Sequence, residues 1–336
     1  MPGFDPARLT AELKAHALRI GFDGVGVAEA TFLEPEARHL DAWLRAGRHG
    51  GADGAMAWMG RNYEKRVDPR VLVPGARSVV SVFRSYWPPQ EAPPRAGASA
   101  EPDAPAAGRV SRYARGDDYH DVLKDGLAEL FDWLDRAAGG AGGRVFVDSA
   151  PVMDKAWAQR AGLGWVGKNT NLLTPTHGSF VFLGEMIVDV PLVPDAPFAA
   201  DHCGSCTRCL DACPTDALDA PYQIDATRCI SYWTIEHRGE TMPEIASEFE
   251  SWLFGCDVCQ EVCPWTRFSQ PTRDARLMPR PETEPQTEAD LREWLELDLE
   301  AFRERFRKSP IKRAKLSGLT RNVEAVLRNR AGGSPE

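Results

Sequence analysis

Eight cysteines lie close together in one short part of the chain and are its strongest chemical signal. No cysteine precedes residue 203 and none follows residue 263. Cysteines gathered in this way, in a chain without the features of a secreted protein, favour a metal site over disulfides. The first four form the run Cys203-x2-Cys206-x2-Cys209-x3-Cys213, directly followed by proline. In bacterial ferredoxins with this spacing, three thiolates wrap one [4Fe–4S] cluster and the fourth binds another.

The second run, Cys256-x2-Cys259-x3-Cys263-Pro264, lacks a first cysteine at the usual place, and only Cys229 is left to supply it. The sequence therefore predicts two [4Fe–4S] clusters and one-electron transfer. One cluster is expected to take Cys203, Cys206, Cys209 and Cys263, and the other Cys213, Cys229, Cys256 and Cys259. The alternative is a pair of structural zinc sites, although zinc does not favour this tight spacing before proline.

Two polar motifs in the cysteine-free part of the chain could belong to a substrate site. Asp148 ends a predicted strand at 144–148, a position where functional side chains are common; a turn-forming Asp is the alternative. The segment Gly162-x4-Gly167-Lys168-Asn169 nearly matches a phosphate-binding loop, but Asn169 replaces the Ser or Thr that would hold magnesium. The loop is expected to suit an anionic or amide-rich ligand, not to hydrolyse a nucleotide.

The elements that must position these groups divide the chain into three parts. Apolar residues at helical spacing predict helices at 5–20, 119–137 and 153–161, and apolar runs predict strands at 22–28, 79–83, 144–148 and 180–190. Helices and strands thus alternate along this part of the chain. Residues 1–197 are therefore expected to form an α/β or α+β domain. Six prolines among many alanines predict a mobile loop at 88–108. Residues 198–270 form the cysteine segment, and 271–336 a linker and a helical C-terminal segment.

Charge is unevenly distributed along the chain. The net charge is −9 overall. Residues 301–330 hold ten Lys or Arg and two Glu, a net of +8, which leaves −17 for the rest. One interpretation is a charged helix face exposed to solvent, without a specific function. The functional interpretation is a surface that binds RNA phosphates.

The 336-residue chain shows no sign of a membrane span or of export. No stretch reaches about 18 apolar residues. The first residues have no basic region followed by an apolar one, and no twin arginine. We therefore expect a cytoplasmic protein that makes no contact with a membrane.

Taken together, these motifs resemble epoxyqueuosine reductase, a family that acts on tRNA. The resemblance covers roughly residues 5–330 and rests on both cysteine runs and on the segments 113–120, 147–151, 161–170 and 229–232. It implies an α+β fold, with a nitroreductase-like cobalamin-binding domain (1–197), a ferredoxin-like domain with two clusters (198–270) and a short helical end (271–336). It also implies that electrons pass through the clusters to cobalamin, which reduces the epoxide of epoxyqueuosine at the tRNA wobble position to give queuosine.

The resemblance also implies roles for individual residues. Asp148 corresponds to the family's proton donor, a role that requires burial against the corrin to raise its pKa above the ordinary value of about 3.9. The implied cobalamin contacts are Arg61, Tyr113, Ser149, Ala150, Val152, Trp165, Lys168, Asn169, Thr170 and Ser231. The implied tRNA contacts are Arg112, Arg115, Lys312, Arg313, Lys315 and Arg321.

The expected partners are tRNA carrying epoxyqueuosine and an external low-potential electron donor, and the protein is expected to be a monomer. Many family members continue into C-terminal helical repeats beyond residues 309–322, so a smaller tRNA grip is expected here. Two alternatives remain. One is a corrinoid-dependent reductase of a small molecule, similar to reductive dehalogenases. The other is a plain electron-transfer protein, which would leave the N-terminal domain unexplained.

Overall fold

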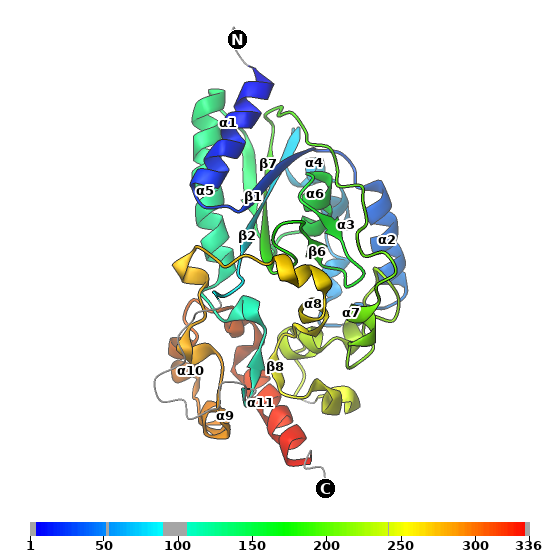
Figure 1. Ribbon diagram of the computed structural model, residues 1–336, viewed down its shortest axis with the longest axis vertical. Coiled ribbons are helices and arrows are strands. Elements are labelled where there is room, and N and C mark those ends of the chain that lie inside the picture. Colours follow the sequence, from blue (N-terminus) through cyan, green and yellow to red (C-terminus); the bar gives the residue numbers. More distant parts are fainter. Residues whose placement is uncertain (1–4, 52–53, 90–105, 241, 333–336) are drawn as a thin grey trace.

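A four-stranded antiparallel sheet forms the centre of the upper half of the molecule (Figure 1). The computed structural model describes residues 5–51, 54–89, 106–240 and 242–332. The strands lie in the order β1 (Gly24–Glu29), β2 (Ser78–Ser85), β7 (Val181–Val188) and β4 (Gly143–Phe146). All eight residues of β2 are buried, because this strand lies inside the sheet and is covered on both faces. The antiparallel order makes the fold α+β.

Two long helices cover one face of the sheet (Figure 1). Helix α1 (Pro6–Arg19) begins at Asp5, whose carboxylate accepts the backbone N–H groups of two following residues. Helix α5 (Tyr119–Ala138) begins at the cap Asp118 and ends at Gly139, whose φ of 73° is the left-handed conformation of a helix end. Both bury leucines against the valines of β1 and β2 and the apolar side chains of β7.

Shorter helices cover the opposite face. These are α2 (Glu34–Arg45), α3 (Tyr63–Val67), α4 (Pro69–Leu72) and α6 (Asp154–Arg160). Trp157 of α6 packs with Val79 of β2 and Ile187 of β7. The end of α6 approaches β1 so closely that a Cβ at Gly26 would lie 2.0 Å from the carbonyl oxygen of Ala161. Helix α6, which follows Asp148 closely in the sequence, therefore packs directly against the sheet.

The cysteine segment lies below the sheet and contains little regular structure. Helices α7 (Arg208–Asp211) and α8 (Val258–Glu261) each follow a cysteine and span a single turn. Next to them, β5 (Trp165–Val166) and β6 (Leu172–Leu173) form an antiparallel hairpin that frames the loop of the phosphate-loop-like motif.

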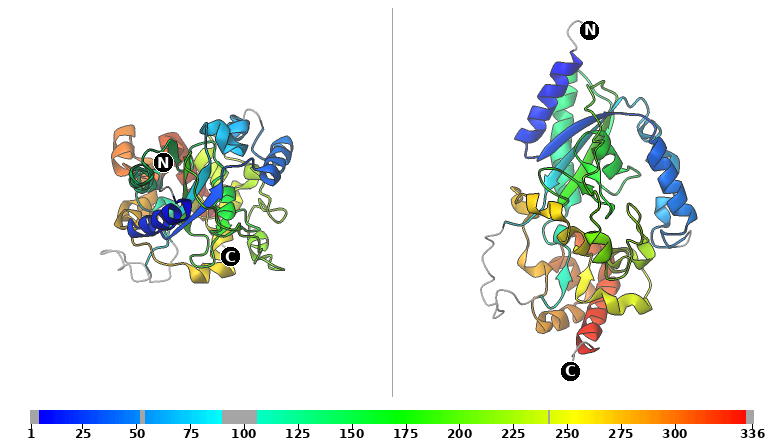
Figure 2. Two further views of the ribbon diagram at one scale, coloured as in Figure 1. Left: turned by 90° about the horizontal axis from the view of Figure 1, so that it is seen from above. Right: turned by 45° about the vertical axis from the view of Figure 1, so that its right-hand side comes forward.

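A second hydrophobic core joins segments that are far apart in the sequence. Strand β3 (Arg109–Val110) pairs in parallel with β8 (Trp252–Phe254). Helices α9 (Glu288–Leu295), α10 (Leu299–Arg305) and α11 (Lys315–Gly332) supply most of the remaining apolar side chains. The lower half of the molecule in the right-hand view of Figure 2 therefore combines residues 107–114 with the C-terminal helices. The division at 197 and 270 remains a prediction, and this core brings residues from all three predicted parts together.

The sequence located the main elements of the sheet domain within a few residues. The predicted helices at 5–20, 119–137 and 153–161 correspond to α1, α5 and α6, and the four predicted strands correspond to β1, β2, β4 and β7. Most of the loop expected at 88–108 lies outside the described residues. Among the described residues, no helix has both the length and the apolar character that crossing a membrane requires.

One acidic side chain is buried in the sheet beside a second acid, Asp154. Glu185 of β7 has no exposed surface, and neither carboxyl oxygen has a hydrogen-bond partner in the described part of the chain. It lies opposite Ser81 and Phe146 on the α6 face. Burial, and then the nearby carboxylate of Asp154, raise the pKa of Glu185 well above its usual range. The side chain is therefore neutral in the folded chain.

Replacement Glu185→Gln is expected to remove a pH dependence of stability. The unfolded chain releases this proton above about pH 4.3, whereas the folded chain keeps it. The free energy of unfolding of the native chain therefore falls as pH rises, by up to about 1.4 kcal/mol per pH unit for one proton. Denaturant unfolding across this range should show the variant gaining on the native chain with rising pH. Parallel curves, or the same gain in a Glu29→Gln control at the exposed end of β1, would contradict the assignment.

Candidate active site and iron–sulfur segment

Asp148 lies just beyond β4 in a strained backbone conformation, with a φ of 50°. The hydroxyl of Tyr119 donates a 2.5 Å hydrogen bond to its Oδ2, and Nε2 of His120 lies 3.5 Å from the same oxygen. Tyr119 and His120 are the first two residues of α5. The side chain of Asp148 is 62% exposed, so a large ligand can reach the carboxylate.

The proton in this group resides on His120. Its Nδ1 lies 2.8 Å from a carboxylate oxygen of Asp118. Burial lowers the pKa of His120, but the hydrogen bonds to Asp118 and Asp148 outweigh burial and raise it to about 9. Burial raises the pKa of Asp148, but hydrogen bonds from His120 and Tyr119 outweigh burial and lower it. The chain alone therefore holds an imidazolium beside a carboxylate, and not the raised pKa of Asp148 that its expected role requires.

Further polar groups without partners lie near Asp148. The guanidinium of Arg66 is buried, forms none of the ion pairs found among the described residues, and has an unsatisfied Nε. The carboxylates of Asp154 and Asp148 are close enough to act on it. Trp58, whose ring lies 5.6 Å from this guanidinium, also has an unsatisfied ring N–H. Buried donors without acceptors are costly, so this region suits a ligand rich in amide carbonyls.

The loop after β5 connects this region to the cysteine segment. The Nζ of Lys168 donates to the carbonyl oxygens of Gly204 and Cys206 at 2.6 and 3.0 Å. The next residue, Asn169, is 3% exposed and donates to the carbonyl oxygen of Cys259 at 3.2 Å. Consecutive side chains of one loop thus hold the two cysteine runs.

The other residues expected to contact cobalamin are placed in different ways. Arg61 and Ser149 are exposed, and Val152 is buried in the core below α6. Ala150 packs partly on that core, while Thr170 has a φ of 64° and its carbonyl accepts the ammonium of Lys155.

Three further predicted contacts lie near the aromatic and cysteine clusters. Trp165 is 1% exposed and its ring packs against Phe198 and Trp265. Tyr113 lies edge-on to Tyr119, with ring centroids 5.9 Å apart. Ser231 hydrogen-bonds to the thiol of Cys229.

All eight cysteines are free of disulfides and partly buried. Their mutual electrostatic effects fall into two sets. Burial, and then the thiols of Cys263, Cys203 and Cys206, raise the pKa of Cys209 to about 11. Burial, and then Cys256, Cys229 and, more weakly, Cys213, raise the pKa of Cys259. Within the described residues, no three His, Cys, Asp or Glu side chains are close enough to share one metal ion; in a [4Fe–4S] cluster each thiolate binds a different iron.

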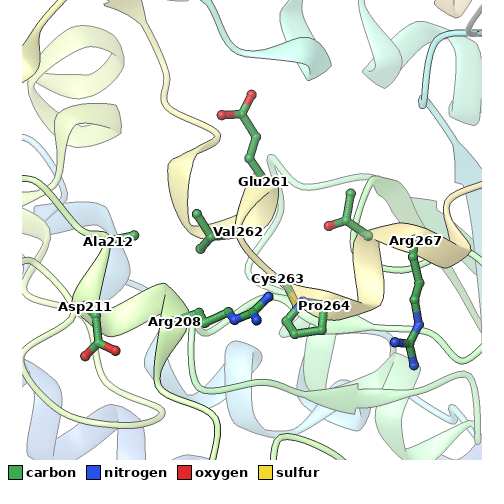
Figure 3. Close-up of a pocket in the computed structure, with 9 residues that line it drawn as sticks. Arg208, Asp211, Ala212, Glu261, Val262, Cys263, Pro264 and Arg267 are labelled. Atoms are coloured by element: carbon green, nitrogen blue, oxygen red, sulfur yellow. The ribbon is translucent and has the colours of Figure 1, made fainter.

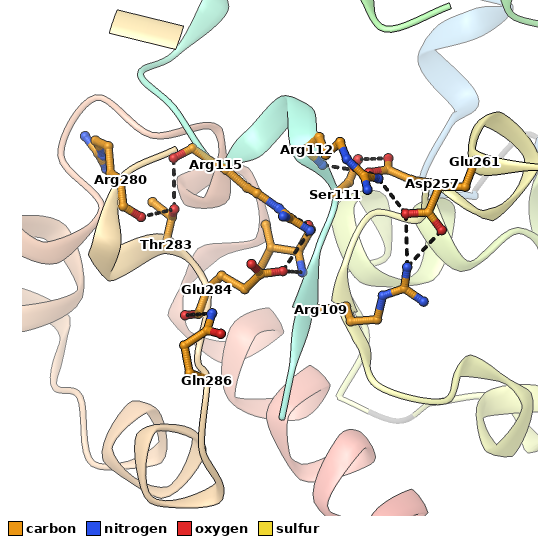
Figure 4. A network of polar contacts seen from close by, with 11 residues as sticks. Arg109, Ser111, Arg112, Arg115, Asp257, Glu261, Arg280, Thr283, Glu284 and Gln286 are labelled. Carbon is orange, nitrogen blue, oxygen red and sulfur yellow. Dashed lines mark hydrogen bonds and ion pairs between the residues drawn. The ribbon is translucent and has the colours of Figure 1, made fainter. Parts of the chain in front are cut away.

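A network of ion pairs joins β3 and the residues after it to the second cysteine run (Figure 4). The buried carboxylate of Asp257 accepts the hydroxyl of Ser111 at 2.5 Å and the backbone N–H of Arg112 at 2.8 Å. The guanidinium of Arg112 also binds Asp257 and Glu261, at 3.1 and 2.5 Å. Arg115 pairs with Glu284 at 2.8 Å. The charges of Arg112 and Arg115, both expected to contact tRNA, are thus neutralised within the protein.

The C-terminal residues expected to bind tRNA also differ in exposure. Lys312 and Lys315 are exposed, and Arg313 pairs with Glu236 at 2.7 Å. Arg321 is 5% exposed, and its guanidinium donates to the carbonyl oxygens of Trp233, His237 and Gly239. The guanidinium of Arg321 is thus used within the protein, and its contact with tRNA stays a prediction.

Four residues of this region were not singled out from the sequence. Asp257 and Lys155 position loops, while Arg66 and Glu185 are buried without an ion pair among the described residues. An acid between two cysteines of one run, as in Cys256-Asp257-Val258-Cys259, was a usable signal for the first. Burial of Arg66 and Glu185 depends on tertiary contacts that no local pattern shows.

The comparisons with known proteins agree with these features. A family model described as epoxyqueuosine reductase QueG, DUF1730, matches residues 66–149. A model of a 4Fe-4S double cluster binding domain matches residues 202–266. The prediction of two [4Fe–4S] clusters is thereby confirmed, and the alternative of two zinc sites is wrong.

Curated relatives and solved structures match nearly the whole chain. The epoxyqueuosine reductase of Cellulophaga algicola is 45% identical over 312 residues, which cover 93% of this chain and 96% of that protein. A crystal structure of selenomethionine-labelled epoxyqueuosine reductase matches with a TM-score of 0.84 and 33% identity, covering 96% of this chain and 82% of that one. Epoxyqueuosine reductase bound to an epoxyqueuosine-modified tRNA-Tyr stem loop matches with a TM-score of 0.80 and 32% identity, covering 96% of this chain and 81% of that one. The chain therefore belongs to the epoxyqueuosine reductases, a family of oxidoreductases.

Proposed function

We propose that this protein reduces the epoxide of epoxyqueuosine at the wobble position of tRNA to give queuosine. The observation that carries the proposal is the link from the exposed Asp148–Tyr119–His120 group to the cysteine runs. The ammonium of Lys155 donates to the carbonyl oxygen of Thr170 and lies close enough to Asp148 and Cys259 to feel both charges. The loop of Thr170 also holds both cysteine runs through Lys168 and Asn169. An accessible proton-bearing group thus adjoins an electron-transfer segment. Conversion of an epoxide to an alkene needs both, because it consumes two electrons and two protons and releases water.

The two sets of thiols fit two [4Fe–4S] clusters. Cys203, Cys206, Cys209 and Cys263 would hold the first, and Cys213, Cys229, Cys256 and Cys259 the second. Burial raises the pKa of five of these thiols, those of Cys209, Cys229, Cys256, Cys259 and Cys263. Iron would therefore have to displace their protons, which links cluster binding to folding. The carbonyls of Gly204, Cys206 and Cys259 are already fixed by Lys168 and Asn169.

The residues near Asp148 fit cobalamin, whose corrin carries many amide groups. When bound, cobalamin supplies a strongly reducing centre for the two-electron opening of the epoxide. Arg66 and Trp58 offer unsatisfied hydrogen-bond donors to the corrin amides. Tyr113 and Thr170 remain proposed cobalamin contacts. Trp165 supports the loop from the core, and Lys168 and Asn169 act on the cluster loops, so we propose an indirect role for these three residues.

Asp148 would give its proton to the leaving oxygen, and His120 would be the source of that proton. In the open site the carboxylate is stabilised by water, because its side chain is mostly exposed. A ligand that covers the site removes this water and disfavours the charged pair relative to the neutral one. The proton then shifts from His120 toward Asp148, while Tyr119 holds the carboxylate in place.

The exposed end of the chain suits tRNA. Lys312 and Lys315 lie on the surface, and the exposed Arg303, Arg307 and Lys308 lie in the same basic stretch, with no ion pairs among those found in the described residues. Phosphate contacts of this kind make binding sensitive to salt. We therefore propose that these five cations, rather than Arg112, Arg115 or Arg321, hold the tRNA backbone.

Anaerobic turnover tests the proposed reaction directly. Protein with both clusters and cobalamin would be mixed with a low-potential reductant and tRNA carrying epoxyqueuosine. Mass analysis of the digested nucleosides should show the loss of one oxygen, and only when cobalamin is present. No loss in a sample shown to hold both clusters and cobalamin would favour a reductase of a small molecule.

Replacement Asp148→Ala is expected to lower the turnover rate by about 10²-fold or more, the usual contribution of a general acid. Iron content and the absorbance of bound cobalamin should stay unchanged, since Asp148 lies outside both thiol sets. Asp132→Ala, which removes an exposed carboxylate on α5, is the matched control. Full activity of the Asp148 variant would refute its role as proton donor.

Replacement Cys213→Ala is expected to damage the cluster of Cys229, Cys256 and Cys259, although Cys213 belongs to the first run in the sequence. Electron paramagnetic resonance of the reduced protein checks this pairing. The spectrum and iron content should match those of Cys259→Ala and differ from those of Cys206→Ala. The reverse match would show that the proposed ligand sets are wrong.

A further inference from the structure

An open hollow of about 690 Å³ lies on the surface of the cysteine segment (Figure 3). Helices α7 and α8 and the residues after α8 form its walls. Cys263, Val262 and Pro264 line its floor, and Arg208 and Arg267 lie at its sides. The hollow thus exposes a thiol of the first set to the surroundings.

Two exposed arginines give the hollow a positive character. Among the described residues, neither Arg208 nor Arg267 forms one of the ion pairs found in the structure, and both are exposed. Of the two nearby carboxylates, Glu261 is already bound by Arg109 and Arg112. Asp211 is exposed and accepts the hydroxyl of Thr207. Two unpaired cations therefore face one unpaired anion.

The hollow adjoins the thiol set that lies farther along the contacts leading from Asp148. Asp148 bonds to Tyr119, which meets Tyr113, and Tyr113 meets Phe254, two residues before Cys256. The ammonium of Lys155 lies close enough to Asp148 and to Cys259 and Cys229 of the second set to feel all three. The hollow is lined by Cys263 of the first set. Electrons that enter at the hollow would therefore meet the first set before the second.

We propose that this hollow is the docking site of an acidic one-electron carrier protein, an inference that rests on the proposed function. The carrier loses one electron in each encounter and the protein gains one, so two encounters supply the two electrons of one turnover. The carrier's carboxylates would meet Arg208 and Arg267. Outside residues 301–330 the chain has a net charge of −17, so most of its surface repels an acidic carrier. A local positive site beside Cys263 would direct the carrier to the first set.

Charge reversal at Arg267 tests the docking site. Reduced flavodoxin, an acidic flavoprotein, would serve as the carrier, and the bleaching of the clusters in the holoprotein would be followed by anaerobic stopped flow. Arg267→Glu should lower the second-order rate constant at low salt by about tenfold or more, and added salt should shrink the difference. Arg208→Gln, which adds no negative charge beside the first cluster, should show a smaller loss in the same direction.

The controls separate docking from damage to the clusters. Reduction by dithionite, a small anion, should proceed at the same rate in Arg267→Glu and in the native protein at high salt, where charges are screened. Arg136→Glu, at an exposed arginine in the last turn of α5, should leave the flavodoxin rate unchanged. Equal flavodoxin rates in Arg267→Glu and the native protein would overturn the proposal, as would a loss confined to tRNA binding, because that result would make the hollow an RNA contact. Turnover of the tRNA with dithionite tests the proposed function separately from docking.

Discussion

The buried carboxylate of Asp257 is the interaction on which the arrangement of the two halves depends. It lies within the second cysteine run and accepts the hydroxyl of Ser111, the backbone N–H of Arg112 and the guanidinium of Arg112. A buried charge is tolerated only with such partners, and removing one typically costs about 3–5 kcal/mol. The same three bonds fix the chain just before Tyr113 and α5. The position of Tyr119 and His120 against Asp148 therefore depends on a carboxylate in the iron–sulfur segment.

The loop at 165–170 makes the corresponding connection on the other side of the site. The side chains of Lys168 and Asn169 donate hydrogen bonds to backbone carbonyls of the cysteine segment. Because Trp165 is held in an aromatic cluster with Phe198 and Trp265, the loop has little freedom to move when a ligand binds. Hydrogen bonds and charges close to an iron–sulfur cluster set its reduction potential. The ammonium of Lys168 against the carbonyl of Cys206 thus places a positive charge next to a cluster ligand, where it would affect the reduction potential.

The sequence predicted the parts of this molecule that have a strong local pattern. Strand alternation and helix caps located α1, α5, β2 and β7, and the cysteine spacing predicted both clusters. Local pattern could not place Ala107, Val110 and Ala114 in a core with the C-terminal helices, since that packing joins residues more than a hundred positions apart. Arg321 shows the same limit: its charge suggested a phosphate contact, whereas three carbonyls from another segment use its guanidinium. A basic residue in a sequence reveals its charge but not whether the fold has already neutralised it.

The distribution of protons around the sheet also has a physical order. Glu185 is fully buried beside the acid Asp154; both raise its pKa, and so it keeps its proton. Asp148 is exposed and hydrogen-bonded, so it loses its proton, while His120 beside it is protonated up to about pH 9. Only the exposed pair can change its state when a ligand displaces water, because the environment of Glu185 is dry in either case. A proton donated by Asp148 would therefore leave on the side of the sheet domain where this carboxylate is exposed, whereas the proton of Glu185 stays enclosed.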